Sequence, residues 1–500
     1  MKTKIILIWL MTFFLISCED ELTIAPESVG SSATFFTKES DFIQAVNGAY
    51  LPLRPIVNDR AFFLGEMHSD NAYYPRNPAF GATEQSEDIA DFAIPAANGV
   101  TANVHVLNQY RLDYQIIARA NNLLANIDKP IAGFPDATRD YVKGQALFLR
   151  AYAYFELVRY FGKVPMHLTP VPGRKEAALP LSSEGDLYAQ IIADAQQAVA
   201  LLPLKSQRPA VDLGRATSGA ARTLLANVYM AQKKWAEAET LLMEIVASNE
   251  YSLMPEYADA FSTSTGNKNN KESVFEVQFL EGSAGLNGTF LYNFLPRPIT
   301  AAEVGSITGT SNAQSLTAEG MNTPTPDIIA AYEPGDKRKD ASVGYVTLSQ
   351  STRANKVYPY IKKYARPHSL HNNHGMNWPI YRYSEVLLFL AEALNEQGKD
   401  GSSYLNQVRT RAGLGAATGD MREAIFNERR VELAFENKRW FDLVRTDRAV
   451  AVITAYGERI KANPQDYYYP AGSAPRSHVF TNLSLTYALP ADEAALTPHF

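Results

Sequence analysis

The stretch ARTLLANVYMAQKKWAEA, residues 221–238, contains the pattern that decides the fold. Ala226 and Tyr229 lie at helical spacing, two lysines follow, and Trp235 and Ala238 begin the same spacing again. The two small alanines would let neighbouring helices approach closely, while Tyr229 and Trp235 would fill the groove between them. The stretch therefore predicts two packed helices joined by a short turn.

Helical patterns of this kind recur along the chain, separated by short turns. Antiparallel helix pairs with small residues at their crossings are typical of tetratricopeptide-like repeats, and a plain helical bundle is the alternative. Counting apolar positions at i, i+3 and i+4 predicts helices over 38–53, 104–127, 139–161, 186–202, 218–231, 235–248, 383–397, 402–412 and 421–444.

Three long segments between and after the helices lack this pattern. Residues 54–102 are rich in Pro and Asn, residues 251–382 hold only short strand-like runs at 273–279 and 343–348, and residues 457–500 are rich in loops. We expect a mostly α-helical fold, a tetratricopeptide-like helical-repeat scaffold that carries large irregular loops and a few short strands. Because long loops in compact proteins are usually functional, the binding site should lie in them.

Composition excludes several classes of protein. The 500 residues are 46% hydrophobic and 20% charged, which excludes collagen, low-complexity disorder and a protein with many membrane spans. The formal charge of −6 argues against a nucleic-acid partner, since such a partner is held through positive charge. Cys18 is the only cysteine, so no disulfide can form within the chain.

The N-terminus has the features of a bacterial lipoprotein signal. Two lysines precede an apolar run over residues 5–15, which is too short for a permanent membrane span, and Leu15-Ile16-Ser17-Cys18 resembles a lipobox. We expect a signal peptide over 1–17 and lipid attachment at Cys18, with a flexible tether over 18–37. An ordinary secretory signal is the alternative. The acidic run Glu19-Asp20-Glu21 resembles a surface-export signal or is a solvated part of the tether.

The acidic and basic residues of 428–445 could suggest catalysis, but their spacing favours a structural role. Phe426, Leu433 and Trp440 are seven residues apart and form one apolar stripe. Charged side chains flank it at helical spacings that favour ion pairs: Arg429, Glu432, Glu436 and Arg439. Glu385 and Glu392 are interpreted in the same way, as structural residues of a packed helix. We expect the charged residues of 428–445 to form a structural network of ion pairs, here called the clamp, and we expect no catalytic residue.

Other chemical motifs give weak or negative signals. His368, His371 and His374 could ligate a metal, but no carboxylate lies among them, so a polar loop is favoured and neither a metal site nor a cofactor is predicted. No HExxH, Walker A or GxSxG motif occurs.

Sugar binding needs exposed aromatic faces together with polar side chains that bind hydroxyl groups. Residues of these types gather in the two long loop regions before residue 383. The candidates from the first region are Asn71, Tyr73, Tyr74, Arg76 and Phe80, and those from the second are Tyr292, Phe294, Arg297, Asn322 and Trp378.

Several segments, in order along the chain, carry a resemblance to a known family. They are TFF at 34–36 with AVNGAY at 45–50, RAYAYFELVRYFG at 150–162, YRYSEVLL at 381–388 with AEALN at 391–395, and ERRVELAFENKRWFDLVR at 428–445. Together they resemble the SusD/RagB family of outer-membrane nutrient-binding lipoproteins of Bacteroidota. The tail departs from the family pattern, because the chain stops soon after Leu496-Thr497-Pro498.

The resemblance implies a SusD-like fold with an N-terminal half over 38–250 and a C-terminal half over 251–500, intertwined in one globular unit. It also implies a non-catalytic lipoprotein on the outer face of the outer membrane. Such a protein captures oligosaccharides, glycopeptides or peptides and passes them to a SusC-like TonB-dependent transporter. Two alternatives stay open: a lipid-anchored glycoside hydrolase, and a helical-repeat assembly scaffold without a small ligand.

Overall fold

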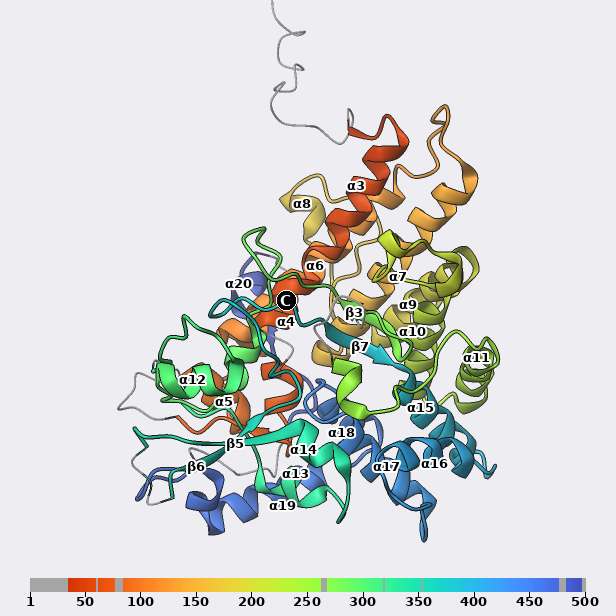
Figure 1. Cartoon of the computed structure of the whole chain (residues 1–500). Coiled ribbons are helices and arrows are strands. Elements are labelled where there is room, and N and C mark those ends of the chain that lie inside the picture. The colour runs from red at the N-terminus through yellow and green to blue at the C-terminus, as the bar shows by residue number, and fades with distance from the viewer. Residues whose placement is uncertain are drawn as a thin grey trace, which may run out of the picture.

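The computed structural model describes residues 35–59, 62–76, 84–261, 268–317, 320–351, 353, 355–475 and 483–496. The signal peptide, Cys18 and most of the expected tether lie outside these residues. Helices of the repeat scaffold fill one side of the molecule, and short strands with long loops fill the other (Figure 1). Within the described ranges, no helix combines the length and apolarity that crossing a membrane requires.

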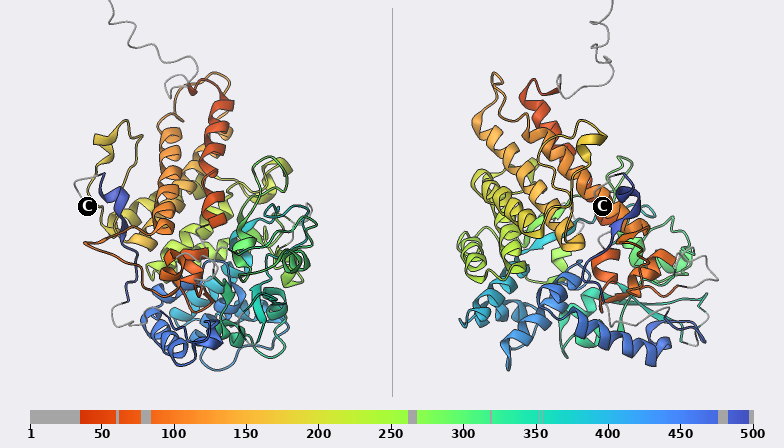
Figure 2. Two further views of the ribbon diagram at one scale, coloured as in Figure 1. Left: turned by 90° about the vertical axis from the view of Figure 1, so that its left-hand side faces the viewer. Right: turned by 180° about the vertical axis from the view of Figure 1, so that it is seen from behind.

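The helical side is a layer of helices packed in sequence order, and its mostly α character confirms the predicted fold class. From behind, the N-terminal helices lead down through the middle pairs to the C-terminal ones (Figure 2). The helices of this layer are α3 (Glu39–Tyr50), α6 (Val104–Leu124), α7 (Asp136–Phe161), α9 (Glu184–Leu201), α10 (Ser218–Ala231), α11 (Trp235–Ala247), α15 (Tyr383–Glu396), α16 (Ser402–Arg411) and α17 (Met421–Glu432).

The pair α10 and α11 forms where the quoted stretch predicts it. Thr217 caps α10, because its hydroxyl accepts a hydrogen bond from the Ala220 N–H. Ala226 and Ala238 are fully buried between helices. Lys233 adopts a positive φ of 58° in the turn, which ends one helix and lets the next begin two residues later.

The strands of the described residues form four two-stranded ribbons, most of which lie with short helices on the side opposite the helical layer (Figure 1). The pairs are β1 (Ala72–Tyr73) with β4 (Thr323–Pro324), β2 (Val100–Thr101) with β8 (Leu489–Pro490), β3 (Ser273–Val277) with β7 (Trp378–Arg382), and β5 (Val343–Thr347) with β6 (Val357–Ile361). The β2–β8 pair is parallel and the others are antiparallel. The remaining helices are α4 (Leu53–Asp59), α5 (Glu84–Ala90), α8 (Arg174–Ala177), α12 (Ala301–Thr308), α13 (Pro326–Ala331), α14 (Lys337–Ser342), α18 (Arg439–Arg445), α19 (Ala449–Ala462) and α20 (Ala491–Ala494).

Two expectations about helices are wrong. The segment 54–102 is not one long loop, because it contains α4, a π-helical turn at Phe62–Met67 and α5. The helix expected over 421–444 is broken into α17 and α18. Phe435 and Asn437 adopt positive φ angles of 67° and 60° there. Their backbone N–H groups then donate to the carboxylate of Glu66, at 2.9 and 3.0 Å.

The predicted apolar stripe is buried in spite of this break in the helix. Phe426, Leu433 and Trp440 are all buried, although they come from two helices and the turn between them. The flanking charges do form ion pairs, as the clamp predicts. Their partners, however, include residues far along the chain: Arg382 for Glu432 and Glu436, and Asp70 for Arg439.

Candidate functional site

The two loop regions singled out from the sequence meet in space. Ala72 and Tyr73 pair with Pro324 and Thr323 in the β1–β4 ribbon. Beyond the ribbon, the Met321 N–H donates to the Pro75 carbonyl at 3.2 Å. The sequence therefore located two segments that build one face of the protein, on the side away from the helical repeats (Figure 1).

The aromatic residues expected to be exposed on this face are buried. Tyr73 and Tyr74 are fully enclosed. The Tyr73 hydroxyl bonds to the Asp91 carboxylate and the Tyr469 hydroxyl, and the Tyr74 hydroxyl accepts from the Gly320 N–H at 2.9 Å. A tyrosine whose ring packs in a core and whose hydroxyl finds an internal partner leaves no face for a ligand. The expectation that these rings are exposed is wrong.

Asn71 is equally enclosed. Its amide donates to the Glu66 carboxylate at 3.0 Å, and its carbonyl oxygen accepts from Arg430 at 2.9 Å. Arg76 lies nearer the surface, with a quarter of its side chain exposed, and pairs with Glu87. Phe80 lies outside the described residues.

The second set of candidates is buried as well. Tyr292, Phe294, Arg297 and Asn322 each keep less than a tenth of their surface. Arg297 donates to the Tyr292 carbonyl at 3.0 Å, and the Asn322 amide donates to the Asn293 carbonyl. These bonds shape the turn around Phe290–Phe294.

Trp378 does not lie in a loop. It begins strand β7 and is 2% exposed, with its ring stacked on Tyr364 at a centroid distance of 5.0 Å. Phe290 contacts it edge-on at 5.3 Å. Trp378 and Phe294 thus belong to an aromatic core beneath the loops rather than to a ligand-stacking surface.

What this face exposes is a group of polar loops, here called the loop platform: residues 281–288, 311–317 and 369–373. The loops are tied to one another by short polar contacts. The His371 N–H donates to Asn312 at 2.7 Å, Asn287 donates to the Asn372 carbonyl at 3.2 Å, and the Gly282 N–H donates to Asn373 at 2.9 Å. Asn312, Gln314 and Asn372 are exposed. The sequence identified the segment around the three histidines as a polar loop, but Asn312, Gln314 and Asn372 were not among its candidate ligand residues.

The three histidines support the platform rather than forming a shared metal site. His368 accepts or donates a bond with the Tyr292 hydroxyl at 2.8 Å, while His371 contacts the edge of the same ring. His374 is buried against Phe290, and burial lowers its pKa to about 3. In the part of the chain that the structure describes, no three His, Cys, Asp or Glu residues are grouped to hold a metal.

His371 is the histidine nearest to solvent. Partial burial, the neighbouring His368 and Arg297 all lower its pKa, so the ring is neutral at pH 7. Its Nδ1 accepts from the Gln314 N–H at 3.2 Å, which leaves the proton on Nε2 as a donor. A neutral imidazole in this tautomer can therefore donate from Nε2 to a hydroxyl group of a ligand.

The carboxylates of the 428–445 segment are placed for structure. Burial alone would raise the pKa of Glu432, but Arg411, Arg382 and Arg338 outweigh it and hold that pKa far below its ordinary value. Glu385 and Glu392 are paired with Lys438 and Arg445. A carboxylate fixed in its ionised form by arginines has no proton to donate as a general acid.

Comparison with known proteins agrees with this architecture. The family model described as "SusD family" matches residues 335–497, and the one described as "Starch-binding associating with outer membrane" matches residues 36–230. SusD-like protein P25 from Formosa agariphila is 26% identical, over 89% of this chain and 90% of its own.

Solved structures share the fold at lower identity. Surface glycan-binding protein A from Bacteroides uniformis superposes with a TM-score of 0.74 at 24% identity, covering 93% of this chain and 99% of its own. Surface glycan-binding protein A from Bacteroides thetaiotaomicron, in complex with laminarihexaose, gives a TM-score of 0.73 at 21% identity, covering 92% and 98%. With both family models matched in order and the helical scaffold in place, the chain belongs to the SusD/RagB family.

Proposed function

We propose that this protein is a non-catalytic surface lipoprotein that captures oligosaccharides and passes them to a SusC-like TonB-dependent transporter. The observation that carries the proposal is the loop platform, where exposed amides and a neutral imidazole stand on loops tied together by hydrogen bonds. Glycan binding by structural relatives, stated in the name of the laminarihexaose complex, supports the same class of ligand.

The chemistry of the platform suits hydroxyl groups better than charged ligands. Amide side chains offer a donor and an acceptor on one planar group, which matches a sugar hydroxyl or a pair of neighbouring hydroxyls. His371 adds a donor at Nε2 while remaining neutral. Peptides and glycopeptides also present amide and hydroxyl groups, so they are the second substrate class to test.

Under this proposal, the residues chosen from the sequence divide into two groups. Asn71, Tyr73, Tyr74, Phe294 and Trp378 hold the face in shape from below, because they are buried in its core. Tyr292 lies directly beneath the platform, where it contacts His368 and His371, and Arg297 donates to its backbone carbonyl. Direct contact with the ligand falls to the exposed polar residues above them.

Calorimetry on residues 19–500 tests the capture role, with laminarihexaose, other glucans, plant and host glycans and a set of peptides as ligands. The double variant His371→Ala/Asn372→Gly removes one partly exposed and one exposed polar side chain, and glycine suits the positive φ of 56° at position 372. Losing two or three hydrogen bonds at about 0.5–1.5 kcal/mol each should weaken binding by roughly tenfold or more. Glu237→Gln, on an exposed part of α11, is the matched control and should bind as wild type.

The results separate the alternatives. Binding to a glycan that the double variant loses and the control keeps supports capture at the platform. Binding to peptides alone would keep the capture role but change the proposed ligand from a glycan to a peptide. An unchanged affinity and stoichiometry of glycan binding in the double variant would contradict the platform as the site. Release of sugar from a bound glycan by the wild-type protein would favour the glycoside hydrolase and overturn the non-catalytic proposal.

The transporter and the lipid anchor are tested in cells. An affinity-tagged protein should co-purify with a TonB-dependent barrel from outer membranes. The Cys18→Ala variant should lose its lipid and leave the membrane fraction, since stable anchoring requires acyl chains. Protease treatment of intact cells should digest the wild-type protein if the anchor faces outward. A protein protected from protease until the cells are broken would contradict the surface location.

A further inference from the structure

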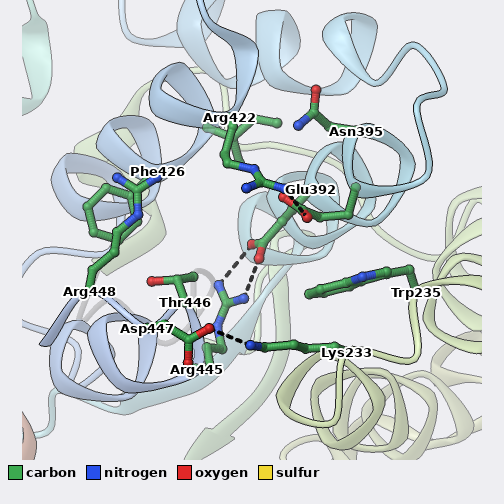
Figure 3. A pocket seen from close by; sticks show the side chains of 12 residues that line it. Lys233, Trp235, Glu392, Asn395, Arg422, Phe426, Arg445, Thr446, Asp447 and Arg448 are labelled. Carbon is green, nitrogen blue, oxygen red and sulfur yellow. Dashed lines mark hydrogen bonds and ion pairs between the residues drawn. The ribbon is translucent and has the colours of Figure 1, made fainter.

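A separate hollow lies on the helical side of the molecule. It has a volume of about 270 Å³ and is bounded by the start of α11, the end of α15, the first turns of α17 and the turn that follows α18 (Figure 3). Helical spacing aligns its walls: Glu392, Asn395 and Glu396 share one face of α15, and Arg422 and Phe426 share one face of α17. The loop platform contributes no residue to it.

Trp235 is the aromatic wall of this hollow, and it differs from the other described tryptophans. Trp378 and Trp440 are 2% and 1% exposed and are enclosed by other rings. Trp235 is partly exposed, and within the described ranges no aromatic ring or cation is stacked on it. Across the hollow, Phe426 is already covered by the guanidinium groups of Arg439 and Arg448, at 4.6 and 4.2 Å. Trp235 therefore offers the ring face that a ligand can occupy.

The polar groups around Trp235 are arranged in neutralised pairs. Arg445 donates to both oxygens of Glu392, and Arg422 donates to Glu396. Arg448 donates in the same bidentate way to Glu423, at 2.7 and 2.6 Å. Since each of these arginines has a carboxylate partner, the hollow carries no uncompensated cluster of positive charge for an anion. The pairs keep further N–H groups and oxygen lone pairs that hydroxyl groups can bind.

Asn395 adds an uncommitted amide. Its side chain is partly exposed on the hollow and makes no hydrogen bond to another described residue. At the opposite edge, Lys233 and Asp447 form an ion pair at 2.5 Å, and each adopts a positive φ in its turn. Figure 3 shows Asn395 and this ion pair on opposite sides of the space, with Trp235 between them at one wall.

We propose that this hollow is a second saccharide-binding site, which takes one hexose-sized unit of a neutral glycan. The apolar C–H face of the sugar lies on the Trp235 ring, and its hydroxyl groups bind Asn395, Glu392 and Arg422. The volume is just below the 300–1,000 Å³ typical of drug-sized ligands, as a single sugar unit requires. This site goes beyond the proposed function, which depends on the loop platform alone.

Tryptophan fluorescence isolates this site, because in residues 19–500 only Trp235, Trp378 and Trp440 are present and the latter two are buried. Glucose, galactose, mannose, xylose and laminarihexaose are titrated while emission and acrylamide quenching are recorded. At least one should shift the emission and protect the protein from acrylamide, whereas glycerol at equal concentration should not. Trp235→Phe should abolish the response.

Asn395→Ala keeps the reporter and tests the polar contact. Because no described hydrogen bond is lost, the variant should fold as wild type, and the affinity from the titration should fall by about three- to tenfold. His371→Ala should leave the response unchanged. A lack of protection by every sugar, a response that persists in Trp235→Phe, or a response lost in His371→Ala would each overturn the second site. Failure of the platform variants in calorimetry would leave this result untouched.

Discussion

Glu432 provides the sharpest test of the clamp, because three arginines converge on one fully buried carboxylate. Its oxygens lie 3.1 Å from Arg338, 2.9 Å from Arg382 and 2.5 Å from Arg411. All four side chains are at most 4% exposed. Glu432→Gln keeps the shape of the side chain and removes its charge.

The expected loss of folding stability follows from the arginine charges that the variant leaves without a partner. Removing one partner from a buried ion pair costs about 3–5 kcal/mol, since the remaining charge stays out of water. Arg338 and Arg382 retain other carboxylates, Asp336 and Glu436 among them, which prevents a larger loss. Unfolding entropy for a chain of this length is about 1 kcal/mol per kelvin, so we expect the Tm to fall by about 3–5 °C.

Differential scanning calorimetry at pH 7 measures this change. The matched control is Glu244→Gln, which removes the same charge from an ion pair with Arg222 in which the glutamate is 49% and the arginine 25% exposed. An exposed pair contributes about 1 kcal/mol or less, so the control should melt within about 1 °C of wild type. Equal melting temperatures for the two variants would refute the reasoning that the buried charges hold the clamp together.

Three further predictions concern buried groups. Burial raises the pKa of Asp442, but Arg429 and Arg445 outweigh it and lower the pKa to about 2. About 2 kcal/mol of stability is therefore present above pH 4 and lost as the pH falls toward 2, and in urea titrations the deficit of Asp442→Asn should shrink over that range. For Glu66, burial raises the pKa to about 7 against the hydrogen bonds that it accepts. The resulting stability is present below pH 4.5 and lost as the pH rises through 7, so Glu66→Gln should gain about 3 kcal/mol relative to wild type between pH 4.5 and 8 in the same assay. Tyr73→Ala empties a buried site and should lower stability by about 3–5 kcal/mol, while calorimetry on the folded variant should find glycan affinity within about twofold of wild type.

The helices could be predicted from the sequence because their signals are local. The turn between α10 and α11 requires only the spacing of Ala226, Tyr229, Trp235 and Ala238, and α10 begins and ends where the pattern indicates. The break between α17 and α18 could not be predicted in this way. Phe435 and Asn437 leave the helical conformation to bond Glu66, which is about 370 residues earlier in the chain.

The sequence identified two segments that the structure brings together, but it did not reveal which of their side chains are exposed. Pro and Asn content identified the segments around Tyr73 and Asn322, and the structure joins them. Whether a loop tyrosine faces solvent depends on distant partners such as Tyr469, which no local pattern reveals. Trp235 shows the reverse case, because its helical spacing predicts a core residue and yet one part of its ring borders an open hollow.

The bonds from Asp70 to Arg430 and Arg439 also constrain when the protein can fold. Their donors lie 360 and 369 residues further along the chain. At a synthesis rate of about 5–20 residues per second, the carboxylates of Glu66 and Asp70 precede their partners by roughly 20–70 s. During that interval, both carboxylates lack their distant partners, and the segment around them cannot close against the later part of the chain. Completion of this core must therefore follow synthesis of nearly the whole polypeptide, and a chain truncated before residue 430 would lack both arginine partners of Asp70.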